Sequence, residues 1–223
     1  MNDRPHDDAS GERPWFDRLA HDLRNPLTSL QTAAYLLRSD PGGSNAQELA
    51  DIVVRQAQRL SKMTEELDDW SRAAQRRLVD PGERVDLEST LDMAIGAIRD
   101  CTLDPVYAPD ARGLVVQGDA LRLSQLFRSL AEQSLARDAQ SARITVSRRD
   151  GVADIAFEDH GPPLDDDARD NLLRAPQVPP IDHGLGLRLL IAKAIVEGHG
   201  GTLAIDGADA NVNHRFRCTL PLA

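Results

Sequence analysis

Apolar residues recur at steps of three and four along the first part of the chain, the spacing of one face of an α-helix. In the first stretch they are Phe16, Leu19, Leu23, Leu27, Leu30, Ala34 and Leu37. We predict a helix over residues 15–39, ended by Asp40-Pro41-Gly42-Gly43. A second helix is predicted to start after Ser44, which with Gln47 resembles a capping box, and to end at Asp80-Pro81-Gly82. Its apolar stripe is Leu49, Val53, Leu60, Met63, Leu67, Trp70 and Ala74.

Two long helices joined by a short loop pack antiparallel, but these two carry apolar side chains outside a two-helix seam. The additional positions are Ala33, Leu36, Ile52, Val54 and Ala57. A lone hairpin leaves them exposed, whereas two copies forming a four-helix bundle cover them. We therefore expect a homodimer built on this hairpin. The alternative is a single-chain bundle completed by later helices.

After residue 84 the pattern changes to short helical stripes that alternate with strand-like runs. Asp86 is placed to cap one helix, and Asp150-Gly151 between two alternating runs is a strong hairpin signal. The remaining elements are a strand at 114–116, a helix opened by Gly118-Asp119, a short helix at 165–173, a helix from Gly184, and strands near 203–205 and 216–220. The predicted fold class is α+β: a helical hairpin followed by a two-layer α/β sandwich, with three helices on one antiparallel sheet.

Charge and composition exclude several classes of function. The chain has 26 Lys and Arg against 36 Asp and Glu, a formal net charge of −10, which argues against binding to nucleic acid or anionic lipid. No apolar run approaches the ~20 residues of a membrane span, so membrane insertion is not expected. Residues 1–13 are polar and are expected to form a disordered tail. Two widely separated cysteines, Cys101 and Cys218, are typical of a soluble protein in a reducing cytoplasm.

His21 departs from the core pattern of the first helix. It lies two residues before the core position Leu23, about 200° around the helix, and so should face solvent. Asp22 follows it, and Asn25 lies one turn along on the same face. Pro26 removes a backbone donor from the helix interior and predicts a bend there. Taken alone, these residues also fit a surface histidine beside a tolerated kink.

Four motifs, in family order, resemble those of two-component sensor histidine kinases. The first is the H-box, His21-Asp22-Leu23-Arg24-Asn25-Pro26, and the second is the approach to the N-box, at Gly118-Asp119, Arg122-Leu123 and Gln125. The third is the first glycine box, at Asp159 and Gly161. The fourth is the second glycine box, Gly184-Leu185-Gly186-Leu187, which is followed by residues 195–201. The resemblance runs from about Trp15 to the C-terminus. It implies a HisKA-type dimerisation and histidine phosphotransfer domain over residues 14–80 and a Bergerat-type (HATPase) ATP-binding domain over residues 84–223.

The resemblance also implies roles for the H-box residues. His21 would be the phosphoacceptor, because a neutral imidazole is nucleophilic near pH 7. Asp22 would hydrogen-bond one ring nitrogen and act as a base or orienting group. Asn25 matches the position that helps to place water for removing phosphate from a partner's aspartate.

In the ATP-binding domain, Asp159 corresponds to the carboxylate that accepts the adenine amino group, and Gly161 would let the backbone approach the base. Gly184, Leu185, Gly186 and Leu187 would bring a loop and a helix terminus to the phosphates. The alternatives are a simple turn aspartate and an ordinary glycine-rich helix start.

The N-box departs from the family pattern. Two asparagines that hold Mg²⁺ there are replaced by Ser129 and Gln133, which still share a helix face and each offer an oxygen. The family's lysine and aromatic residue are replaced by Ala136 and Arg137. Arg137 is a candidate phosphate partner, as is Arg188, although ordinary surface arginines are the alternative.

The resemblance therefore implies a cytoplasmic histidine kinase that uses ATP and Mg²⁺ to phosphorylate His21. The phosphoryl group would pass to an aspartate in the receiver domain of a response regulator, and the stimulus could arrive from an upstream sensor protein. Two alternatives remain open: a histidine phosphotransferase or phosphatase with a degenerate ATP site, and a non-enzymatic dimeric regulator of a kinase.

Overall fold

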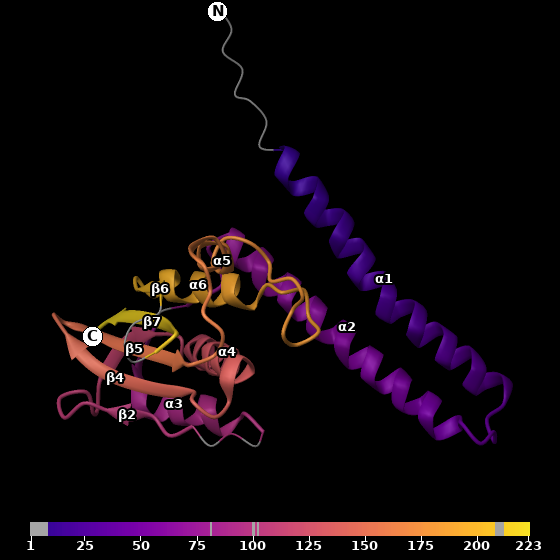
Figure 1. Ribbon diagram of the computed structural model, residues 1–223, viewed down its shortest axis with the longest axis horizontal. Coiled ribbons are helices and arrows are strands. Elements are labelled where there is room, and N and C mark those ends of the chain that lie inside the picture. Colours follow the sequence, from indigo (N-terminus) through magenta and orange to yellow (C-terminus); the bar gives the residue numbers. More distant parts are fainter. Residues whose placement is uncertain (1–8, 81, 100, 102, 208–211) are drawn as a thin grey trace, which may run out of the picture. The chain divides into compact units, whose positions relative to one another are not determined.

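The computed structural model describes residues 9–80, 82–99, 101, 103–207 and 212–223 (Figure 1). The chain divides into two compact units. The first contains the chain up to Leu67 together with His183–Leu185, and the second contains Asp68–Asp182 and Gly186–Ala223.

Two long helices, α1 (Ala9–Ser39) and α2 (Ala46–Ala74), form the predicted hairpin (Figure 1). Helix α1 begins inside the segment expected to be a disordered tail, and residues 1–8 of that segment lie outside the described residues. It also continues through Pro26 without interruption, so the expected bend does not break the helix. The capping box is not formed, because the Gln47 side chain donates to Asp51 Oδ1 at 3.1 Å instead of reaching back to Ser44.

The hairpin leaves many of its apolar side chains in contact with solvent. Ala33 and Met63 are the buried hydrophobic side chains in its described part. Large apolar side chains that stay exposed are Leu27 (44%), Tyr35 (61%), Leu36 (47%) and Val54 (54%). Leu36 and Val54 agree with the expectation that a lone hairpin does not cover its own apolar surface, whereas the expectation was wrong for Ala33, which is buried within the hairpin's own chain.

The second unit is the predicted α/β sandwich, with more strands than the sequence pattern suggested. Its helices are α3 (Leu87–Gly96), α4 (Ala120–Asp138), α5 (Asp166–Leu172) and α6 (Arg188–Gly198). Its strands are β1 (Glu83–Asp86), β2 (Val106–Tyr107), β3 (Val115–Gly118), β4 (Arg143–Arg149), β5 (Val152–Asp159), β6 (Thr202–Asp206) and β7 (His214–Pro221).

The prediction of one antiparallel sheet was wrong. The main sheet has the order β2-β4-β5-β7-β6, and its edge pair β2-β4 is parallel. A separate two-stranded antiparallel sheet joins β1 to β3. Strands β1 and β2 are four and two residues long, too short to show the alternation by which strands are identified from sequence.

Helices α3, α4 and α6 form a layer with the main sheet (Figure 1). Helix α4 packs on β5, α6 packs on β6 and β7, and α3 packs on α4. Phe127 of α4 stacks on Phe157 of β5 with ring centroids 6.4 Å apart, and both are fully buried. Side chains of β7 alternate between buried and partly exposed, as expected for a strand with one face on the core.

Local signals positioned several elements as predicted. The Asp86 and Asp119 side chains cap α3 and α4 by accepting hydrogen bonds from the N–H groups of Ser89 and Arg122. Asp150 and Gly151 both have positive φ angles, 45° and 81°, which a tight turn between β4 and β5 requires.

Buried His199 ties the end of α6 to the start of α4. Its Nε2 accepts a hydrogen bond from the Asp119 N–H at 3.0 Å, and its Nδ1 lies 2.7 Å from the Ile195 carbonyl oxygen. Gly118 permits this approach, because a Cβ there would lie 2.7 Å from His199 Cδ2. His199 is therefore a structural residue of the sandwich.

No helix in the described part of the chain is long and apolar enough to cross a membrane.

Candidate functional site

His21 projects from α1 into solvent, as the helical arithmetic predicted. Its side chain is 68% exposed. The Nδ1 atom lies 3.4 Å from Asp22 Oδ1 and 3.4 Å from Asn25 Nδ2, so the three H-box side chains meet at one ring nitrogen. Nδ1 can donate a proton to Asp22 or accept one from Asn25 Nδ2, but not both at once. In the tautomer with the proton on Nδ1, directed to Asp22, the lone pair is on Nε2, which is then the atom suited to attack an electrophile.

Asp22 is itself held by a neighbour on α1. Arg18 Nε lies 3.4 Å from Asp22 Oδ2, one helical turn before it, while Asp22 Oδ1 is directed to His21. The carboxylate is 28% exposed, less than the histidine it orients. The Arg18 contact therefore limits the positions that Asp22 can take relative to the imidazole.

Asp159 lies at the end of β5 and is completely buried. Its Oδ1 accepts a hydrogen bond from the Gly161 N–H at 3.0 Å, and Arg137 Nε lies 3.1 Å from Oδ1 and 3.2 Å from Oδ2. Burial raises the pKa of the Asp159 carboxyl, but the neighbouring His214 imidazole and the Arg137 guanidinium outweigh burial and hold that pKa below its ordinary value. Asp159 is therefore an ionised carboxylate with an internal cationic partner.

The Arg137 side chain comes from the last turn of α4 and is 14% exposed. A second part of the guanidinium, Nη2, donates to the Pro162 carbonyl oxygen at 2.5 Å. Arg137 thus connects α4 to the first glycine box. The phosphate-binding role expected for it remains a prediction.

Sequence reasoning gave no role to His214, the first residue of β7. The antiparallel register of β5 and β7 pairs Asp159 with His214, and His214 Nδ1 lies 3.5 Å from Asp159 Oδ2. The ring is fully buried against Phe216, with centroids 4.5 Å apart. Within the described residues neither ring nitrogen makes a hydrogen bond. The alternation of apolar residues in β7 would have indicated that His214 points inward, but not that it meets Asp159.

The second glycine box lies before α6. Gly186 has a φ of +78°, and its carbonyl oxygen accepts a hydrogen bond from the Gln177 N–H at 2.9 Å. A Cβ on Gly186 would lie 2.3 Å from the Gln177 carbonyl oxygen, so glycine is needed there for two reasons. Leu187 occupies the N-cap position of α6 and makes no side-chain capping bond.

Gly184 and Leu185 are buried and belong to the same compact unit as the hairpin helices. Within that unit the Leu185 N–H donates to Glu66 Oε2 at 2.9 Å. Leu185 lies in the loop expected to approach phosphates, and its N–H is directed to a carboxylate in this structure.

The residues expected to hold Mg²⁺ lie on one face of α4. Ser129, Gln133 and Arg137 follow at intervals of four residues, so this stripe leads from the N-box to Asp159. Ser129 and Gln133 are buried, and Ser129 Oγ donates to the Gln125 carbonyl oxygen at 2.8 Å.

The charges around the N-box are already paired. Glu132, which sequence reasoning did not single out, contacts Arg188, and Arg188 also lies 3.1 Å from Asp182 Oδ2. No group of three or more His, Cys, Asp or Glu side chains is arranged for a metal ion among the described residues. Ser129 and Gln133 are neutral oxygen donors, so they do not provide the one or two carboxylates through which a protein usually binds Mg²⁺. Phosphate oxygens would have to supply most of the charge.

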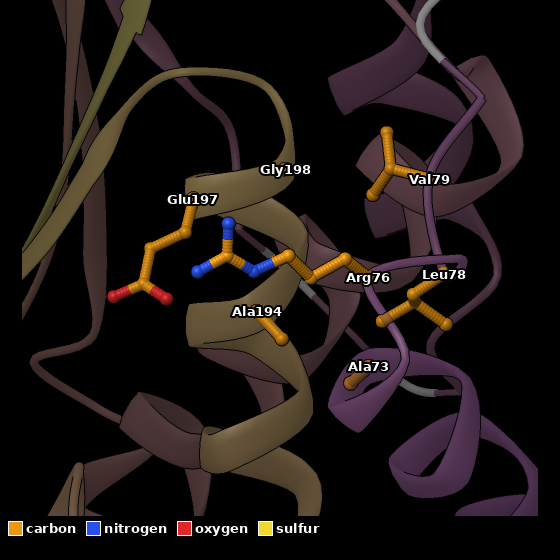
Figure 2. Close-up of a pocket in the computed structure, with 7 residues that line it drawn as sticks. All are labelled: Ala73, Arg76, Leu78, Val79, Ala194, Glu197 and Gly198. Carbon is orange, nitrogen blue, oxygen red and sulfur yellow. The ribbon is translucent and has the colours of Figure 1, made fainter.

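A cavity of about 500 Å³ lies elsewhere in the second unit, against the C-terminal end of α6 (Figure 2). It is lined by Ala73, Arg76, Leu78, Val79, Ala194, Glu197 and Gly198. Figure 2 shows Arg76 reaching across α6 on the side of Glu197. Glu197 and Gly198 belong to the 195–201 segment that follows the second glycine box, but none of the residues expected to act in catalysis or in nucleotide or metal binding lines the cavity.

Two family descriptions match separate parts of the chain. Residues 15–76 match the His Kinase A (phospho-acceptor) domain. Residues 118–223 match the histidine kinase-, DNA gyrase B-, and HSP90-like ATPase. His21 falls in the first match and Asp159 in the second.

Curated relatives align along most of this chain. Sensor protein ChvG of Rhizobium meliloti (strain 1021) is 28% identical over 226 residues, which cover 91% of this chain and 39% of the relative. Signal transduction histidine-protein kinase/phosphatase MprB of Mycobacterium ulcerans (strain Agy99) is 30% identical over 200 residues, which cover 83% of this chain and 39% of the relative. The chain thus spans about two fifths of the length of these relatives.

Solved structures share the fold. Acinetobacter baumannii histidine kinase AdeS matches with a TM-score of 0.71 at 20% identity, over 91% of this chain and 98% of that chain. Histidine kinase ThkA in complex with response regulator protein TrrA matches with a TM-score of 0.67 at 19% identity, over 93% and 61%. Full-length ShkA in complex with AMPPNP matches with a TM-score of 0.63 at 19% identity, over 93% and 46%.

Proposed function

Because the chain belongs to the two-component sensor histidine kinase family, we propose that it phosphorylates His21 from ATP and passes the phosphoryl group to a response regulator aspartate. The observation that carries this proposal is the solvent-facing imidazole of His21, whose Nδ1 lies 3.4 Å from Asp22 Oδ1. Both residues fall in the segment that matches the phospho-acceptor domain. The ATPase match that follows along the chain supports the nucleotide-binding half of the proposed reaction.

In the phosphorylation step, His21 Nε2 attacks the γ-phosphorus of ATP, and the bond from that phosphorus to the β,γ-bridging oxygen breaks. ADP leaves with that oxygen and its electron pair. As positive charge develops on the imidazole, Asp22 stabilises or accepts the Nδ1 proton, for which it lies 3.4 Å away. Asn25 would act in a separate reaction, the hydrolysis of a phosphorylated regulator, by orienting the water that attacks the aspartyl phosphate and releases inorganic phosphate.

We propose that Asp159 and Gly161 recognise the base, and that the Gly184–Leu187 loop approaches the phosphates. Ser129 and Gln133 would each contribute an oxygen towards a Mg²⁺ ion held mainly by phosphates and water. The ion would neutralise phosphate charge. Family membership supports nucleotide binding, as does the fold shared with a structure that contains AMPPNP.

The phosphotransferase or phosphatase alternative has specific support. Ser129 and Gln133, at the two positions expected to hold the metal, differ from the family's asparagines in the length of the side chain that carries the oxygen. The relative MprB is named as both a kinase and a phosphatase. In this alternative His21 and Asn25 still handle phosphate on the regulator, while phosphorylation from ATP is slow or lost.

We also propose that the hairpin, residues 14–80, forms a homodimer and contacts the receiver domain, with residues 84–223 as the ATP-binding domain. The exposed side chains Leu36 and Val54 support dimerisation, and the complex of ThkA with a response regulator supports that class of partner.

The test uses the purified chain with Mg²⁺ and γ-labelled ATP. Wild type should gain label with the acid-labile, base-stable behaviour of a phosphoramidate, and His21→Ala should gain none. Gln31→Ala, at an exposed position further along the same helix, should match wild type. Gln133→Asn should increase labelling by about tenfold or more if the N-box limits turnover. Label that persists in His21→Ala would refute the proposal. Phosphate exchange only with a phosphorylated regulator would establish the alternative.

A further inference from the structure

Asp159, the buried carboxylate expected to recognise adenine, is already contacted by other groups of the same chain. Arg137 Nε contacts both Asp159 oxygens, the Gly161 N–H donates to Oδ1, and His214 lies beside Oδ2. An ionised carboxylate offers about four acceptor directions, and these groups approach along both oxygens. The Asp159 side chain is 0% exposed, so no acceptor direction opens to solvent.

Arg137 is the member of this cluster that can leave without a change of fold. Gly161 follows Asp159 closely in the chain, and His214 is fixed opposite it by the β5–β7 register. Arg137 instead lies in the last turn of α4, one residue before its end, and reaches Asp159 with a long, flexible side chain. Rotation of that side chain would remove the guanidinium from both carboxylate oxygens while α4, the Gly161 N–H on Oδ1 and His214 beside Oδ2 stay in place.

We propose that Arg137 is an intramolecular competitor for the nucleotide base: its guanidinium must leave Asp159 before the amino group of an adenine nucleotide can bind there. This inference rests on the proposed function, because it concerns the same ATP site. The chain is then divided between a closed form, with Arg137 on Asp159, and an open form that binds the base. Apparent affinity falls in proportion to the open fraction.

Arg137 as a competitor for the base and Arg137 as a ligand of the phosphates would have opposite effects on nucleotide affinity. A guanidinium that bound phosphates would strengthen nucleotide binding, and its removal would weaken it. A guanidinium that blocks the base carboxylate has the opposite effect, and only on ligands that carry the base. The sign of the change on removing Arg137 therefore separates the two roles.

The experiment measures dissociation constants of AMPPNP and of inorganic triphosphate by calorimetry on the purified chain. Arg137→Ala should bind AMPPNP about tenfold or more tightly than wild type, with no gain for triphosphate. Arg128→Ala, an exposed arginine on the same helix, removes the same charge and should show no gain for AMPPNP. Unchanged, weaker or absent AMPPNP binding by folded Arg137→Ala would overturn the proposal, as would an equal gain for triphosphate.

A measurement on wild type covers the case in which Arg137→Ala fails to fold. The Nε–H resonance of Arg137, assigned by its loss in Arg137→Lys, should shift when AMPPNP saturates the protein, and an unchanged resonance at saturation would refute displacement. The kinase proposal is judged separately by label on His21. If His21 is labelled but Arg137→Ala binds AMPPNP no more tightly than wild type, only the competitor proposal is rejected. If Arg137→Ala binds AMPPNP more tightly but His21 is never labelled, only the kinase proposal is rejected.

Discussion

At the scale of single residues, the His21–Asp22 pair combines an exposed nucleophile with a carboxylate held from behind by Arg18. Asp22→Asn keeps the size and a hydrogen-bonding oxygen but loses the charge that balances a developing imidazolium. We expect the initial rate of His21 phosphorylation to fall about 100-fold, with AMPPNP affinity unchanged. A rate within threefold of wild type would contradict a proton-handling role for Asp22.

Asp159 gives a second residue-scale prediction, on stability. Asp159→Asn leaves the Arg137 guanidinium without its charged partner in a largely buried site, and should lower the free energy of unfolding at pH 7 by about 3 kcal/mol. The pKa of Asp159 is lowered in the folded state relative to its ordinary value of 3.8. Its stabilising contribution is therefore complete well above pH 3.8 and is lost as pH falls through the lower native pKa.

Urea unfolding of wild type and Asp159→Asn between pH 7 and pH 3 checks this sign. The difference between the two proteins should be constant down to about pH 5 and shrink below pH 4. Asp104→Asn, at an exposed position, should differ from wild type by less than about 0.5 kcal/mol. A difference that grows on acidification would show that Asp159 is not stabilised as a carboxylate.

The direction of a side chain could be predicted from sequence where it depends on the geometry of a single helix or strand. The outward direction of His21 follows from helical geometry, and its 68% exposure confirms it. The contacts of Asp159 with Arg137 and His214 could not be predicted in this way. They depend on where α4 ends against β5 and on the β5–β7 register, and both are set by packing between distant segments.

At the scale of elements, the contact between His199 and Asp119 joins α6 to α4. His199→Ala would leave the Asp119 N–H without its acceptor and create a cavity beside Gly118. We expect a loss of about 2 kcal/mol in unfolding free energy, measured by urea titration. The exposed His160→Ala should change stability by less than about 0.5 kcal/mol. Equal effects of the two substitutions would refute a structural role for His199.

Elements with strong local signals were predicted, and those without them were not. The Asp caps of α3 and α4 and the Asp150-Gly151 turn depend on residues adjacent in sequence, and the structure contains all three. Strand β2 exists only because Val106 and Tyr107 pair with Thr145 and Val146 on a distant strand. No local pattern encodes that parallel pairing.

At the scale of the whole molecule, the hairpin has unburied apolar surface that a second copy could cover. Leu36→Glu places a charge on this surface at a side chain that is 47% exposed. We expect light scattering to show a dimer for wild type and a shift towards monomer for Leu36→Glu. Leu121→Glu is the matched control, because Leu121 is 76% exposed on α4 and should leave the dimer intact. A monomeric wild type would refute the proposed assembly.

The unbroken course of α1 through Pro26 has a consequence for local dynamics. Proline supplies no amide hydrogen to the carbonyl oxygen of Asp22, so the helix lacks one bond of its ladder in the turn that follows His21. Fluctuational opening of this turn breaks fewer bonds than opening of the turns on either side, and deuterium uptake around it should be faster than in the rest of α1. The His21 imidazole is thus next to the turn of α1 that opens most easily. A docking protein could change the orientation of the imidazole without unfolding the helix.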